Sequence, residues 1–185
     1  MDAFSYLSVL LSIIIGLAIT QVLQGYRSLL LNRRRIVYFF PPLAWSACIL
    51  LIAVQMWWSS FGLAGRAEWT FLAFSIILLQ TVLFYMTAGL VLPDMPPGET
   101  IDLKAHYFRE SRPFYILFLT IILVSLTKNI TLDNGMSAGE WIFHGLFIAV
   151  GLVAIATRRS WVHHVVVTAV CVLFVTYIAL LFAHL

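Results

Sequence analysis

The sequence predicts an all-α fold, a polytopic membrane protein built as a six-transmembrane-helix bundle with short loops. Apolar blocks of about twenty residues, the length that crosses a bilayer, fill nearly the whole chain. Hydrophobic residues make up 62% of its 185 residues and charged residues 10%, and the mean hydropathy is +1.00. These polar residues are too few to cover a soluble domain. We therefore expect residues 1–185 to form a single transmembrane domain.

Proline, glycine and arginine mark the ends of the first three spans. Arg33-Arg34-Arg35 follows the first span, and Pro41-Pro42 opens the second, where the first helical N–H groups need no partner. Pro93 and the prolines after it end the third. The predicted spans are 4–31, 42–63 and 69–92.

The second half of the chain predicts three more spans and one interfacial helix. Thr100 is the expected N-cap of that helix, which covers 101–112 and has Ile101 and Phe108 on its apolar side. Pro113 separates it from the fourth span, and no strand is expected. The remaining predicted spans are 113–130, 137–157 and 161–185.

Lysine and arginine concentrate on one side of the predicted bundle. Of the 11 such residues, only Arg66 and Lys128 fall on the other side. Cytoplasmic loops carry this kind of excess, so both termini are expected outside. The basic residues form a candidate docking or lipid surface, and anionic headgroups at the cytoplasmic face are expected partners. Its members are Arg33, Arg34, Arg35, Lys104, Arg109 and Arg112.

Small and polar residues follow one side of the first span. This side is either a packing face between helices or, in an assembly of several copies, the wall of a polar pathway. Gln21 and Gln24 continue it, and Gln55 and Gln80 on other spans are expected to join them in an interhelical network. The candidate residues of this polar stripe are Ser8, Ser12, Gly16, Thr20 and Gln24.

Few other residues suggest chemistry. Cys48 and Cys171 have no metal or redox spacing, so they are read as buried apolar residues without a disulfide. His144 and His184 are weak candidates for the axial ligands of a b-type haem. No nucleophile–base pair or phosphate-binding loop is present. The sequence therefore predicts no enzyme, no catalytic or metal site, no cofactor and no nucleic-acid partner.

Three segments resemble a group of uncharacterised small polytopic proteins of the bacterial inner membrane. These segments are FSYLSVLLSIIIGLAITQVLQG (4–25), VQMWWSSFGL (54–63) and DLKAHYFRESR (102–112). The resemblance implies a location in the inner (plasma) membrane and no activity.

Two hypotheses on function remain. The first is an interaction or regulatory membrane protein that docks a partner, such as a membrane protein or a second copy of itself, at its basic cytoplasmic surface. The alternative is a small oligomeric channel or facilitator lined by the first helix.

Overall fold

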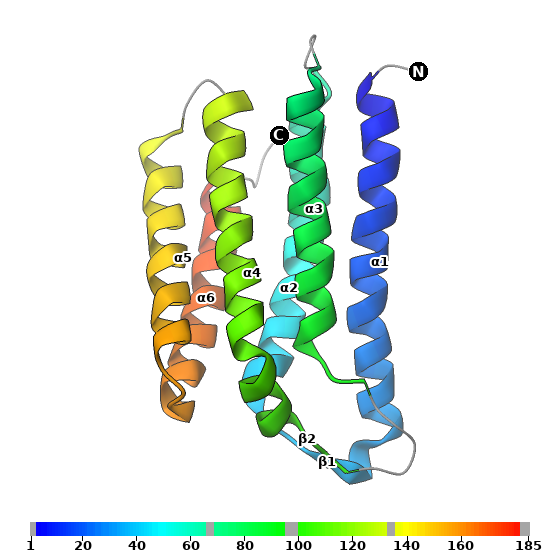
Figure 1. Ribbon diagram of the computed structural model, residues 1–185, viewed down its shortest axis with the longest axis vertical. Coiled ribbons are helices and arrows are strands. Elements are labelled where there is room, and N and C mark those ends of the chain that lie inside the picture. The colour runs from blue at the N-terminus through cyan, green and yellow to red at the C-terminus, as the bar shows by residue number, and fades with distance from the viewer. Residues whose placement is uncertain (1–2, 66–68, 95–99, 133–135, 182–185) are drawn as a thin grey trace.

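The chain folds into six long helices. The computed structural model describes residues 3–65, 69–94, 100–132 and 136–181, and all structural statements here concern these ranges. Each of the six helices is long and apolar enough to cross a membrane. This confirms an all-α, multi-pass membrane protein. The helices in Figure 1 are α1 (Ala3–Leu31), α2 (Phe40–Ser60), α3 (Phe71–Val91), α4 (Leu103–Leu132), α5 (Ala138–Ala156) and α6 (Ser160–Leu181).

The helices close into a ring. Going round it, the main contacts join α1 to α3, α3 to α4, α4 to α5, α5 to α6, α6 to α2, and α2 back to α1. Figure 1 shows α1, α3, α4 and α5 side by side in front, with α2 and α6 behind them. α1 begins and α6 ends at the same end of the bundle, as an even number of spans requires. We call the other end, which holds Arg33–Arg35 and Arg158–Arg159, the basic end.

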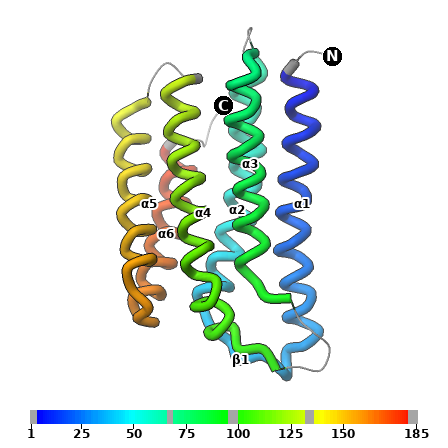
Figure 2. The backbone as a smooth tube through the Cα atoms, viewed as in Figure 1, coloured from blue at the N-terminus to red at the C-terminus, as the bar shows by residue number. Residues whose placement is uncertain are grey.

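The helix bounds agree with the predicted spans except at α4. The predicted break at Pro113 is wrong, because α4 continues through this proline as one helix of 30 residues. Backbone groups at membrane depth must bond within their own helix, so ending the helix there would cost more than the single hydrogen bond that proline removes. Figure 2 shows the first turns of α4 bent away from the rest of the helix, as expected near a proline.

The start of α4 also differs from the prediction. Asp102, not Thr100, caps the helix: its Oδ1 accepts hydrogen bonds from the backbone N–H groups of Lys104 (2.8 Å) and Ala105 (3.1 Å). Two short strands, which the sequence did not predict, lie beside it. β1 (Ile36–Val37) and β2 (Ile101–Asp102) pair in parallel, Ile36 opposite Ile101. This ladder joins the end of α1 to the start of α4.

The side chains inside the ring are mainly apolar and aromatic. Trp45 and Tyr115 are the two largest fully buried residues, on α2 and α4. The apolar side of α1 faces into the ring, and its Leu7 and Val22 are completely buried. At its lower part α1 comes very close to the segment after α3: a Cβ on Gly25 would lie 2.6 Å from a methyl of Leu92. Any larger residue here would require Leu92 to move.

Candidate functional site

The basic end brings together two of the predicted docking segments. Arg33–Arg35 form a single 3-10 turn between α1 and β1. Because β1 pairs with β2, that turn is held beside the start of α4 and therefore beside Lys104. The side chains of the three arginines and of Lys104 are exposed. Segments more than sixty residues apart in the chain thus present their charges on one surface.

Aromatic side chains tie the third basic segment to the same place. The Phe39 ring centre lies 5.6 Å from that of Tyr107 on α4 and 5.1 Å from that of His164 on α6. The Lys104 ammonium lies 5.9 Å from the centre of the Phe39 ring, within range of a cation–π contact. Since α6 begins directly after Arg158–Arg159, these contacts fix that pair relative to the other two segments.

A chain of buried hydrogen bonds supports this cluster from within. The Trp45 indole N–H donates to the Tyr115 hydroxyl (3.0 Å). That hydroxyl lies 2.9 Å from the hydroxyl of Tyr107, which in turn lies 2.9 Å from Nδ1 of His163. His163 Nε2 lies 2.9 Å from the Thr157 carbonyl oxygen. The chain therefore crosses from α2 through α4 to the start of α6.

The two ends of this chain fix the direction of every hydrogen bond in it. An indole N–H can only donate and a carbonyl oxygen can only accept. His163 Nε2 must therefore carry the proton that it donates to Thr157, and in the neutral imidazole Nδ1 accepts from Tyr107. Tyr115 then donates to Tyr107. His163 is completely buried, and each of the two tyrosine hydroxyls accepts one hydrogen bond and donates one.

The remaining charges at this end leave it strongly basic. Arg109 Nε donates to the carboxylate of Glu110 (2.8 Å) and its Nη2 to Nδ1 of His106 (3.3 Å). His106 Nε2–H donates to the Leu90 carbonyl (3.2 Å). The other carboxylates described at this end, those of Asp94 and Asp102, are outnumbered by the arginines and Lys104. The exposed basic residues of the three segments form what we call the basic platform: Arg33, Arg34, Arg35, Lys104, Arg109, Arg112, Arg158 and Arg159.

The polar stripe of the first span lies largely on the outside of the bundle. Ser12, Thr20 and Gln24 are exposed, while Ser8 and Gly16 are half-buried. Thr20 donates its hydroxyl proton to the Gly16 carbonyl (2.8 Å), and the Ser8 hydroxyl donates to the Ser5 carbonyl. Within this chain, α1 packs through its apolar side instead. A pathway along the stripe would therefore need several copies.

The expected network of glutamines is not formed. Gln21 and Gln24 line a hollow of about 260 Å³ between α1 and the end of α3, at the basic end. Gln55 and Gln80 lie inside the ring toward the opposite end. None of the four makes a hydrogen bond to another among the described residues. The prediction was wrong because helix assignment alone does not give the depth at which each side chain lies.

Of the two candidate haem ligands, only His144 lies among the described residues. His144 is buried on α5, where Nδ1–H donates to the Glu140 carbonyl (2.7 Å) and Nε2 accepts from Ser125 (3.3 Å). His184 lies outside the described residues. Among those described, no three His, Cys, Asp or Glu side chains are grouped so that they could hold a metal ion.

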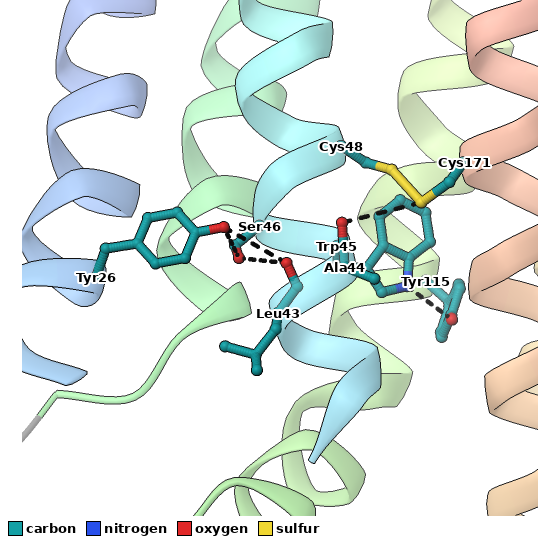
Figure 3. The surroundings of a disulfide bond; sticks show 8 residues. All are labelled: Tyr26, Leu43, Ala44, Trp45, Ser46, Cys48, Tyr115 and Cys171. Carbon is teal, nitrogen blue, oxygen red and sulfur yellow. Dashed lines mark hydrogen bonds between the residues drawn. A yellow bond between two sulfur atoms is a disulfide. The ribbon is translucent and has the colours of Figure 1, made fainter. Parts of the chain in front are cut away.

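The expectation that the two cysteines form no disulfide is wrong. Cys48 on α2 and Cys171 on α6 form a disulfide, with their Cα atoms 6.1 Å apart, a usual separation. Figure 3 shows the bond next to the indole of Trp45, with Cys171 Sγ 3.9 Å from the Ala44 carbonyl oxygen. The pair lies 123 residues apart in sequence. Only the closure of the ring between α2 and α6 brings them together, and no local spacing reveals that.

No family model, curated protein or solved structure matches this chain.

Proposed function

We propose that this chain is an interaction or regulatory protein of the bacterial inner membrane, which uses the basic platform in the cytoplasm to dock an acidic segment of a protein partner. Both termini then lie outside, an orientation that the excess of arginine at the basic end favours. One observation carries the proposal. Three basic segments from distant parts of the chain are held in one arrangement by the β1–β2 ladder, the rings around Phe39 and the hydrogen bonds to His163.

Rigidity distinguishes docking from general attraction to lipid. The orientation of the chain in the membrane and its attraction to anionic headgroups need only positive charge near the membrane surface. Each basic residue there contributes about 1 kcal/mol of attraction to anionic lipid. Neither requires that Arg33–Arg35 be fixed beside Lys104. A preformed arrangement of charges does favour a partner that matches it, because fewer side chains and loops are ordered on binding.

Photocrosslinking can test the proposal in living bacteria. A benzophenone amino acid at Val37, which is 52% exposed and lies in β1, would sit on the platform without removing a charge. We expect a crosslinked product of defined mass that contains a second protein. The same product should disappear when Arg33, Arg34, Arg35 and Lys104 are all changed to Gln.

The matched control places the photocrosslinker at Leu72, which is 64% exposed at the start of α3, on the opposite end. This position should not yield the product. A product at Val37 that contains only phospholipid, or a protein product whose yield does not change in the four-fold Gln variant, would reject the docking proposal and leave the platform as a lipid anchor.

A further inference from the structure

The inside of the ring is hollow toward the end opposite the basic platform. An outer chamber of about 270 Å³ lies between the ends of α2 and α4 and the start of α5, and a deeper chamber of about 100 Å³ reaches down to Trp45. The two chambers adjoin each other and share part of their wall. The residues that line both are Gln55, Met56, Gln80, Ser125 and Tyr177.

The two chambers differ in character. Polar groups, including Lys128, Asn129 and Glu140, surround the outer chamber. The deeper one is lined mainly by aromatic and aliphatic side chains, among them Phe118 and Phe147. Its wall also holds Thr87, Ser125 and His144 but no lysine, arginine, aspartate or glutamate. Both exceed the roughly 10–15 Å³ that one water molecule needs on this measure. The hollow therefore suits an amphipathic molecule whose apolar part points toward Trp45.

Two carboxamides at the junction lack protein partners. Neither Gln55 nor Gln80 makes a hydrogen bond to another described residue, and both border the two chambers. No buried side-chain nitrogen or oxygen among the described residues lacks a partner, so these amides are open to the chambers. At membrane depth an amide without a partner costs about 2 kcal/mol or more. Water or a ligand must therefore satisfy them.

The charges at the mouth favour an uncharged head group. Lys128 and Glu140 carry opposite charges, so the mouth attracts neither sign as a whole. The Glu140 carboxylate is already engaged, since it accepts from the Ser137 N–H and hydroxyl at 2.8 Å each and from the Asn129 amide at 3.5 Å. The carboxamides of Gln55 and Gln80, which line both chambers, each offer donors and an acceptor, which complement an amide or a similar neutral group.

We propose that this hollow is a binding site for a small, flat, neutral amphiphile that enters from the end opposite the basic platform. Its apolar body lies in the deeper chamber over Trp45, and its uncharged hydrogen-bonding head meets Gln55 and Gln80. The indole N–H of Trp45 is already bonded to Tyr115, so the floor of the site offers ring surface and no free donor.

A photoreactive probe of this chemistry tests the site. We would use 4-azidobenzamide, an aromatic ring with a primary amide, on the full chain in lipid nanodiscs. Labelling should map to the α4 segment that contains Phe118 and Ile122, both on the wall of the deeper chamber, and excess benzamide should prevent it. The double variant Gln55→Leu, Gln80→Leu should weaken the apparent affinity about tenfold, the loss of roughly one net hydrogen bond.

The control is Gln24→Leu, which removes a carboxamide at the basic end and should leave labelling unchanged. Unfolding of each variant, followed in parallel, shows that the bundle remains folded. Labels spread over lipid-facing residues without competition would mean simple partitioning and reject the site. Hexanol competing as well as benzamide would show that the hollow takes an alkyl chain, as a lipid would supply, and would overturn the claim of a flat ligand.

Discussion

The two ends of the bundle are built on opposite principles. At the basic end, each polar side chain along the chain from Trp45 to Thr157 is hydrogen-bonded to the next, and rings pack around Phe39. At the opposite end, the ring of helices encloses two adjoining chambers, and the carboxamides of two glutamines have no partner among the described residues. Trp45 marks the boundary between them. A rigid surface and a hollow interior need different packing, and inside the ring this chain separates them along its long axis. The hollow at Gln21 and Gln24 lies instead between α1 and the end of α3.

The largest effect is expected where the hydrogen-bond chain is cut. His163→Ala removes the acceptor of the Tyr107 hydroxyl and leaves a void at a completely buried position. We expect the free energy of unfolding to fall by about 3 kcal/mol or more. Titration of SDS into detergent micelles that contain the protein would measure this.

The neighbouring histidine provides the control for that substitution. His164 is half-buried, and its Nδ1–H bonds locally to the Ser160 carbonyl. Its ring contacts that of Phe39 but takes no part in the chain from Trp45 to Thr157. His164→Ala should therefore cost about 1 kcal/mol or less. Equal losses in the two variants would mean that the chain from Trp45 to Thr157 does not hold the basic end together.

The disulfide at the boundary should have the next largest effect. Cys48→Ala opens a link that closes a loop of 123 residues, so we expect a loss of about 2–4 kcal/mol. Adding a reductant should lower the stability of the natural chain and leave the variant unchanged. If both cysteines of the denatured, unreduced protein react with an alkylating reagent, the link between α2 and α6 is absent.

The sequence predicted what depends on local pattern. Apolar blocks and the residues between them placed α1, α2, α3, α5 and α6 and the basic side, because length and charge are properties of neighbouring residues. Cys48 with Cys171, and Ile36 with Ile101, could not be paired, because each pairing depends on how distant segments meet in the ring. The hollow was missed for the same reason.

At the candidate site, too, the sequence predicted local charge but not the contacts between distant segments. The sequence identified Arg33–Arg35 and Lys104 as one surface from their charge alone. It did not reveal that Tyr107 and His163 support this surface, since a tyrosine and a histidine in apolar spans carry no spacing that sets them apart. The prediction for Pro113 failed because the rule that proline ends a helix is weaker in a membrane, where the backbone has no water to bond with.

Two glycines of α1 provide a smaller effect that tests close packing at the basic end. A Cβ on Gly25 would lie 2.6 Å from Cδ1 and 2.9 Å from Cβ of Leu92, whereas one on Gly16 would meet nothing within 4 Å. Gly25→Ala should cost about 1–3 kcal/mol, and Gly16→Ala should gain up to about 1 kcal/mol from helix propensity. Thermal unfolding of both variants would measure these changes in stability. Similar values for the two would mean that α1 does not approach the segment after α3 as closely as described.

The smallest effect is expected on the outer side of α1. Ser12 and Thr20 are exposed there, and the Thr20 hydroxyl bonds to its own helix, so Ser12→Leu and Thr20→Leu should each change the free energy of unfolding by less than about 0.5 kcal/mol. Leu7→Ala, on the completely buried side, should cost about 2 kcal/mol or more. A loss in the Ser12 or Thr20 variants that grows with protein concentration would place the polar stripe in a contact between copies, and the alternative of an oligomeric pathway would then replace the view of α1 as a lipid-facing wall.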